Sequence, residues 1–334
     1  MQAYGSPPQG ITYAKTREGF ALPIIDVTNP RFAIADDPDM ARAAYQTFVD
    51  NERRRARIPK FIMRLMLRRA ARQSRLIRAM FHSQDGFLDG MSTYVMKLGP
   101  DNLVPPYDTP MDRRLAASPH VMLVRLRMQQ VAHLIAEGIV DDLAAASGAA
   151  PLVLLNIGGG PALDSINALI LLRRDRPDLL RRHIAVEVLD ASPDGTYFGA
   201  NALAALQADG PLAGLDIAMR RHAYDWNAPA PLSSLIATHS GAVIAASSEG
   251  ALFEYGSDQA IVANLKVLLA GGVRFVAGSV TGDDETRRRT IAQTRFKLVP
   301  RGIAGFAPLA EQAGFTIAKI APAMMSDQVL LHPV

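Results

Sequence analysis

The sequence predicts an α/β fold: a doubly wound, mainly parallel, seven-stranded Rossmann-like sheet with an antiparallel last strand, preceded by an all-helical N-terminal domain. After about residue 146, short apolar runs alternate with helical stretches, which is typical of parallel strands joined by crossovers. The link between the last two runs, 315–320 and 328–331, is too short for a helical crossover, so these strands should be antiparallel. Earlier in the chain, apolar residues recur at helical spacing. We therefore predict an arm and helical cover domain at 1–145 and a sheet domain at 146–334.

The composition fits a globular protein and narrows its chemistry. With 334 residues, 49% of them hydrophobic, the chain can fill a full core. It has no cysteine, which excludes disulfides, thiolate metal sites and a cysteine nucleophile. The seven histidines show no metal-ligand spacing, so no metal site is predicted. No apolar run approaches the roughly 20 residues that cross a bilayer, and early charged residues speak against a secretory signal, so we expect a cytoplasmic protein.

The N-terminal region is predicted to begin with an irregular arm and to continue as helices. Residues 1–30 are rich in glycine, proline and polar residues and show little periodicity. Helices are expected between residues 38 and 80 and at 119–146, where apolar residues recur every three to four positions. The residues expected on the inner faces of the first stretch are Phe61, Leu65, Met66, Leu76, Ile77 and Met80.

The elements of the sheet domain follow its apolar runs. Five strands are predicted at residues 152–157, 184–189, 217–223, 242–246 and 273–277, ahead of the antiparallel pair. Helices should connect them, the last two at 259–269 and 309–313.

A glycine-rich turn, Asn156-Ile157-Gly158-Gly159-Gly160-Pro161-Ala162, lies between the first buried strand and a helix. Glycines let the backbone turn sharply and approach a ligand, and the helix N-terminus offers free N–H groups. Leu163 stands where the NAD fingerprint needs a small residue, so a dinucleotide is disfavoured. The turn therefore predicts contacts to a nucleoside-type cofactor from Asn156 and from residues 158–161, with a plain strand-to-helix turn as the alternative.

Asp190 ends the second strand and precedes Ala191, Ser192 and Pro193. A carboxylate at this position of a doubly wound fold accepts the hydroxyls of a ribose. The alternative is that Asp190 or Ser192 only caps the following helix. Glu187, on the same strand, is a weaker ribose candidate.

In their order along the chain, five segments resemble the motifs of class I S-adenosylmethionine-dependent methyltransferases; the N-terminal region resembles no family that we recognise. The five segments are the glycine turn, Leu189-Asp190-Ala191-Ser192-Pro193, Tyr224-Asp225-Trp226, Leu268-Leu269-Ala270-Gly271-Gly272-Val273 and Leu309-Ala310-Glu311-Gln312-Ala313-Gly314-Phe315-Thr316. The resemblance covers roughly residue 149 to the end. It implies S-adenosylmethionine as the cofactor, with Asp190 on the ribose and Asp225 and Trp226 near the adenine. Asn156 and Ala162 depart from the usual acid and last glycine of the first motif.

The segment after the fourth strand is the predicted place of the acceptor chemistry, because open α/β sheets bind ligands at the carboxyl ends of their strands. Ser247 and Ser248 are predicted cofactor contacts at the end of this strand. Glu249 is the first candidate for the base that removes a proton from the acceptor, and Glu254 and Tyr255 are further candidates. A helix-start or surface carboxylate explains Glu249 equally well, and Glu254 and Tyr255 are weaker candidates than Glu249.

A run of basic residues in the helical region makes a positive surface without any acid inside it. It comprises Arg53, Arg54, Arg55, Arg57, Lys60, Arg64, Arg68, Arg69, Arg72, Arg75 and Arg78. Such a surface suits phosphate backbones, an anionic membrane or an acidic substrate, or else pairs with acids of its own chain or of a second copy. Aromatic residues that stack on bases are nearly absent from it.

Together these features predict an S-adenosylmethionine-dependent methyltransferase that acts on a small-molecule acceptor, with O-methylation as the leading version. An RNA-modifying methyltransferase is the first alternative, because of the arginines. A methyltransferase-like protein that binds without catalysis is the second, because of Asn156 and Ala162. A homodimer is a further expectation.

Overall fold

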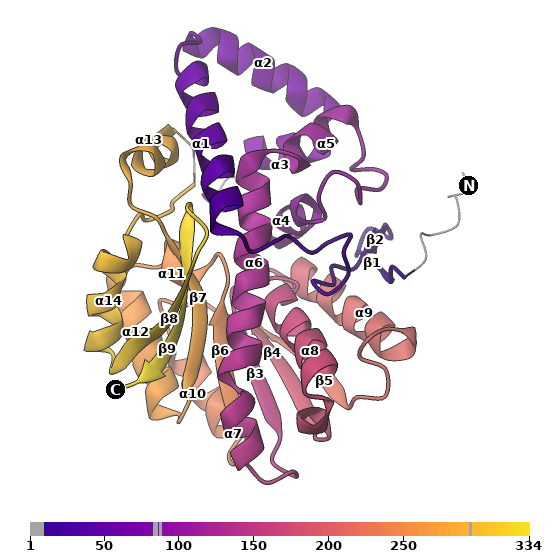
Figure 1. Cartoon of the computed structure of the whole chain (residues 1–334), viewed down its shortest axis with the longest axis vertical. Coiled ribbons are helices and arrows are strands. Elements are labelled where there is room, and N and C mark those ends of the chain that lie inside the picture. The colour runs from indigo at the N-terminus through magenta and orange to yellow at the C-terminus, as the bar shows by residue number, and fades with distance from the viewer. Residues whose placement is uncertain (1–9, 83–85, 87–88, 294–295) are drawn as a thin grey trace.

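The computed structural model describes residues 10–82, 86, 89–293 and 296–334, and its centre is a seven-stranded sheet (Figure 1). The strands lie in the order β5-β4-β3-β6-β7-β9-β8. Their bounds are β3 (Leu152–Ile157), β4 (Ile184–Leu189), β5 (Ile217–His222), β6 (Val243–Ser248), β7 (Phe275–Thr281), β8 (Phe315–Pro322) and β9 (Ser326–Pro333). Strands β3 to β7 pair in parallel, and β9 is antiparallel to both β7 and β8. The predicted fold class is confirmed, including the antiparallel last strand.

Helices cover both faces of this sheet, which explains why its central strands are apolar runs. All six residues of β3 are buried. Leu152 and Leu154 pack with α8 (Leu163–Asp175) and α9 (Pro193–Asp209) on one face. Val153 and Leu155 face the opposite core, formed with α10 (Ala230–Ala237), α12 (Asp258–Ala270) and α14 (Gly302–Gln312). Two shorter helices complete this half of the chain, α11 (Leu252–Tyr255) and α13 (Glu285–Gln293), with a 3-10 turn at Pro177–Leu180.

The N-terminal helices lie beyond the carboxyl ends of the parallel strands (Figure 1). They are α1 (Pro38–Arg55), α2 (Lys60–Gln73), α3 (Arg75–His82), α4 (Gly90–Lys97) and α5 (Pro110–Ala116). The next helix, α6 (Pro119–Gly138), runs along the face of the sheet and leads into α7 (Val140–Ala145). Val131 and Leu134 of α6 are buried in the same core as Leu152 and Leu154 of the sheet. The helical region and the sheet thus share one hydrophobic core, and the division at residue 145 stays a prediction.

The arm predicted at residues 1–30 is more ordered than its composition suggests; residues 1–9 of it lie outside the described part. Strands β1 (Tyr13–Lys15) and β2 (Ala21–Pro23) form an antiparallel hairpin, so the N-terminal region is not purely helical. The hairpin turns at Gly19, which has a φ of 86°. After it, Ile24 and Ile25 are buried against the sheet domain. Strands of three residues are too short to leave a sequence pattern.

One prediction about the helical region is wrong. Phe61, Leu65 and Met66 were expected to face inward, but they are 74%, 68% and 54% exposed, whereas Leu76 of α3 is buried as expected. The apolar residues of α2 occupy several sides of the helix, so periodicity does not reveal which side packs. The inner side is the one carrying the buried Ala71. None of the described helices is long and apolar enough to span a membrane.

Candidate functional site

The glycine turn joins the carboxyl ends of β3 and β4. The backbone N–H of Gly158 donates to the carbonyl of Leu189 at 2.8 Å, and that of Gly160 donates to the Asp190 carboxylate at 2.9 Å. Gly158 and Gly160 have φ values of 71° and 53°, in the left-handed region that favours glycine. Strand β3 is flanked by β4 on one side and β6 on the other, so the turn stands where the strand order reverses.

Close packing allows only glycine at this turn. A Cβ added to Gly159 would lie 1.8 Å from the side-chain oxygen of Asn156, and one added to Gly158 would lie 3.2 Å from the Trp226 ring. At Gly160, an added Cβ would come within 3.3 Å of the Gly90 Cα at the start of α4. The structure thus brings Asn156 and Trp226, both predicted cofactor residues, against the turn.

Asn156, the departure from the usual acid, is buried below the turn beside another acid. Its amide donates to Asp164 at 2.6 Å and to Ser247 at 3.2 Å. Burial, reinforced by the nearby charge of Glu249, raises the pKa of Asp164. A carboxyl group from the first turn of α8 therefore lies next to the place where the motif acid is missing. Sequence reasoning overlooked Asp164, although an acid following the glycine turn in a mostly apolar helix was a usable signal.

Asp190 holds its own segment in place as well as the turn. Its second carboxylate oxygen accepts from the Ser192 N–H at 2.7 Å, and the Arg221 side chain donates to the Ala191 carbonyl at 2.7 Å. Ser192, not Asp190, is the N-cap of α9. Pro161 rests on the same helix, where a Cβ added to Gly199 would lie 2.4 Å from its carbonyl oxygen.

The segment after β5 lies next to Asp190, whose own N–H donates to the His222 carbonyl at 3.0 Å. Asp225 accepts from the N–H of Asn227, and the Trp226 carbonyl accepts from Asn264 at 2.7 Å. These bonds fix the position of the predicted adenine segment.

The carboxylate of Glu187, the weaker ribose candidate, is already contacted by side chains of the protein. Its buried carboxylate lies 2.7 Å from His222 Nε2, 3.1 Å from His239 Nε2 and 3.5 Å from the Arg220 guanidinium.

The two serines at the end of β6 are buried and bonded within the protein. Ser247 lies beside Asn156, and Ser248 donates to the Ile157 carbonyl at 3.0 Å while accepting from the Leu252 N–H at 2.8 Å. They tie β6 to β3 and to the start of α11.

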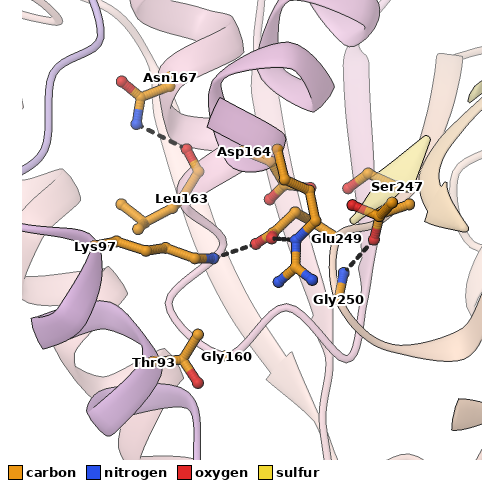
Figure 2. A network of polar contacts seen from close by, with 12 residues as sticks. Thr93, Lys97, Gly160, Leu163, Asp164, Asn167, Ser247, Glu249 and Gly250 are labelled. Carbon is orange, nitrogen blue, oxygen red and sulfur yellow. Dashed lines mark hydrogen bonds and ion pairs between the residues drawn. The ribbon is translucent and has the colours of Figure 1, made fainter. Parts of the chain in front are cut away.

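A buried ion network occupies the predicted catalytic segment (Figure 2). Lys97, from α4, reaches Glu249, whose other carboxylate oxygen accepts from Arg127 of α6 at 2.6 Å. The same arginine pairs with Glu254 at 3.1 Å. None of the four side chains is more than 11% exposed. The N-terminal region therefore contributes two cations to the site, and sequence reasoning identified neither of them.

This network sets the protonation of the candidate bases. Burial alone would raise the pKa of Glu249, but the charges of Arg127 and Lys97 outweigh it and hold that pKa below its usual value. Burial, followed by the charge of Glu254, raises the pKa of Tyr255. Glu249 is thus ionised but a weak proton acceptor, and Tyr255 keeps its proton at neutral pH. The predicted roles of Glu249, Glu254 and Tyr255 as bases remain predictions.

His120, on α6, gives a first testable prediction. Burial, with the charges of Arg287, Arg127 and Arg55, lowers its pKa from 6.5 to about 3. The unfolded chain therefore binds a proton that the folded chain does not, and stability falls as pH drops from 6.5 towards 3. We expect this residue alone to contribute a slope of up to about 1.4 kcal/mol per pH unit.

Urea unfolding across this pH range would measure the slope. The variant His120→Gln cannot titrate, and its stability should depend less steeply on pH than that of the wild type. Since carboxylates also titrate at the acidic end, the difference between the two proteins is the quantity that counts. Identical slopes would contradict the low pKa of His120.

A cavity of about 690 Å³ lies elsewhere, at the amino end of β7. Its lining includes Asp142, Arg274, Phe275 and His332, and none of the predicted site residues. The candidate site is therefore defined by the strand ends and not by this cavity.

The strand order, with β9 antiparallel between β7 and β8, is that of the class I methyltransferase fold. Among solved structures, the chain is similar to a possible exported protein from Bordetella parapertussis, with 15% identity and a TM-score of 0.54 over 89% of this chain and 99% of that chain. It also aligns with the mitomycin 7-O-methyltransferase MmcR, with 17% identity and a TM-score of 0.39 over 67% of this chain and 58% of that chain. The pyocyanin biosynthetic protein PhzM aligns with 12% identity and a TM-score of 0.41 over 64% and 58%. The first likeness shows a shared fold, and the other two are too distant to add to it. No protein-family model and no curated protein sequence matches the chain.

Proposed function

We propose that this protein is an S-adenosylmethionine-dependent methyltransferase, located in the cytoplasm, that methylates a hydroxyl group of a small molecule. One observation carries the proposal: the glycine turn is bonded through Gly160 to Asp190 at the point where the strand order reverses. Doubly wound folds bind nucleosides at this point, with the turn and the carboxylate on either side of the ribose.

The residues present suit this cofactor. Asp190 ends one strand and offers carboxylate oxygens to a ribose, and Asp225 and Trp226 follow the neighbouring strand, where an adenine would stack. Below the turn, Asn156 Oδ1 and Asp164 Oδ2 are buried with no hydrogen-bond partner among the described residues. Unpartnered buried acceptors suit the ammonium group of the methionine part. When bound, the cofactor supplies a methyl group on a positively charged sulfonium.

The acceptor side favours a small molecule over RNA. Helix α4 covers the turn, since a Cβ added to Gly90 would lie 3.3 Å from the Gly160 Cα and Lys97 reaches Glu249. A site covered by a helix suits an acceptor that is held beside the methyl group and shielded from water, and such positioning supplies much of the rate in a displacement. The arginine-rich helix α2 lies far from the sheet, at the outer end of the helical region (Figure 1).

A second candidate function is cofactor binding without catalysis. The observation in its favour is that Glu249 and Glu254 are both neutralised by buried cations, which leaves no carboxylate of this segment poised as a base. A hydroxyl acceptor of low pKa needs no such base, which is why we place methyl transfer first.

Calorimetry followed by a transfer assay tests both functions. We expect S-adenosylmethionine and S-adenosylhomocysteine to bind with micromolar dissociation constants, and labelled methyl groups to pass to members of a panel of phenols and other acidic hydroxyl compounds. Binding without transfer to any panel member would favour the non-catalytic function. Absence of binding by either ligand would exclude both.

A further inference from the structure

Helix α2 presents an unusual concentration of exposed apolar side chains. Five of the large apolar residues exposed in the described part of the chain lie within seven positions of this helix: Phe61, Ile62, Leu65, Met66 and Leu67. The others, Tyr197, Ile320 and Val334, are scattered over the rest of the molecule. Isolated exposed apolar residues are ordinary, but a continuous group of this kind marks an interaction surface.

Four of these apolar residues form two neighbouring rows along one side of the helix, while Leu67 lies on another side. Phe61 and Leu65 are four residues apart, as are Ile62 and Met66, so each pair forms a row and the two rows are adjacent. Ala71, towards the end of the helix, is buried. Among the described elements, α2 makes substantial contacts only with α3, and Figure 1 shows α2 at the outer end of the molecule.

Arginines surround this apolar face. The ten arginines between positions 53 and 78 are all exposed, and the sequence from Arg53 to Gln84 contains no acid. Arg53, Arg55 and Arg75 pair with acids outside that stretch. Within the described residues, the arginines of α2 form no ion pair; they are Arg64, Arg68, Arg69 and Arg72. Both the apolar rows and these charges are therefore available to a partner.

The exposed apolar rows together with the unpaired arginines favour one kind of partner among RNA, a second copy of the chain and a lipid surface. RNA would use the arginines but not the exposed aliphatic side chains, and it binds through stacking aromatics, of which the exposed rows offer only Phe61. A second copy packed symmetrically would bring this face against itself, so the unpaired arginines of both copies would repel one another. An anionic lipid surface satisfies both features, because apolar side chains enter the interface while arginines bind headgroup phosphates.

We propose that α2 docks this protein on anionic membranes, lying in the plane of the lipid headgroups with Phe61, Leu65 and Met66 inserted. The helix has the character of a surface-bound amphipathic helix, with basic residues beside bulky apolar ones. Docking in this way leaves the glycine turn, at the carboxyl ends of the strands, on the side of the molecule that faces the membrane. The proposed docking of α2 on membranes does not depend on the methyltransferase activity proposed above.

Flotation of the full-length protein with vesicles tests the proposal. We expect binding to phosphatidylcholine vesicles that contain phosphatidylserine, weak or no binding to phosphatidylcholine alone, and release by high salt. The variant Arg64→Gln/Arg68→Gln should lower the partition coefficient on the order of tenfold or more. The matched control Arg181→Gln/Lys266→Gln removes the same charge from exposed positions outside α2 and should bind as the wild type does.

A second variant tests the contribution of the apolar rows to membrane binding. Phe61→Ser/Leu65→Ser should reduce binding to the anionic vesicles by at least tenfold, whereas Ile320→Ser, at an exposed position on β8, should leave it unchanged. Absence of wild-type binding at low salt would overturn the proposal. So would binding that neither α2 variant weakens. If sedimentation shows a dimer that Phe61→Ser/Leu65→Ser dissociates, and vesicles are not bound, α2 is an interface between copies instead.

Discussion

Asp190→Ala should abolish most of the affinity for S-adenosylmethionine and S-adenosylhomocysteine. In the proposed complex the carboxylate accepts both ribose hydroxyls, and it also accepts the Gly160 N–H that holds the glycine turn at 2.9 Å. Hydrogen bonds to a charged group contribute about 1.5–3 kcal/mol each. Loss of two of them should weaken binding by about 10²- to 10⁴-fold, measured by calorimetry.

Two control variants test whether the loss of affinity comes from the Asp190 carboxylate. Asp194→Ala removes a carboxylate from the same segment that pairs with Arg17 at the surface, and it should leave cofactor affinity unchanged. Asp190→Asn keeps an acceptor for the Gly160 N–H but loses the charge, so its affinity should lie between those of the wild type and Asp190→Ala. The melting temperature of each variant shows whether the fold survives. Unaltered affinity in a folded Asp190→Ala protein would place the ribose site elsewhere.

The sheet was predictable because its strands are buried on both faces. Strands β3 and β4 begin and end where the apolar runs do, since neither face of a central strand has water to contact. The glycine turn was predictable for a related reason: its φ values and its contact with Asn156 allow no other residue. Burial of a strand and the conformation of a turn both restrict residues that are adjacent in the sequence, so each can be recognised from a short segment of it.

Features that depend on distant contacts were not predictable. The apolar residues of α2 could have faced inward or outward, because only the position of the helix relative to its neighbours decides. Lys97 and Glu249 are 152 positions apart, and no local pattern links them. Glu249 was a candidate base because it follows the end of a strand. Its partners Lys97 and Arg127 lie on two helices, and the sequence does not reveal where those helices run relative to the strand.

Glu249→Gln is expected to be the most destabilising single change at the site. It would leave Lys97 and Arg127 buried without the carboxylate that they share, and Arg127 paired with Glu254 alone. Removal of one partner from a buried ion network costs about 3–5 kcal/mol, because the remaining charge is desolvated without compensation. Urea unfolding at neutral pH should show a loss of this size.

The ion pairs of Glu249 with Lys97 and Arg127 also predict how the stability of the protein changes in acid. The folded pKa of Glu249 lies below the unfolded value of 4.5, so its contribution to stability is present above that pH and is lost as pH falls through the folded pKa. Below this range the wild type and Glu249→Gln should become similar in stability. A difference that persisted unchanged in acid would contradict the role of the Glu249 charge.

A double variant separates a structural role of Glu249 from a catalytic one. Lys97→Met/Glu249→Leu removes one charge of each sign and leaves Arg127 paired with Glu254, so it should be more stable than Glu249→Gln alone. If the double variant binds cofactor and still transfers methyl groups, Glu249 stabilises the fold and is not the base. If Glu249→Gln is as stable as the wild type but loses turnover, the carboxylate acts on the acceptor. The second outcome would require the ion pair with Lys97 to open during the reaction, because the paired carboxylate is too weak a base to take the proton itself.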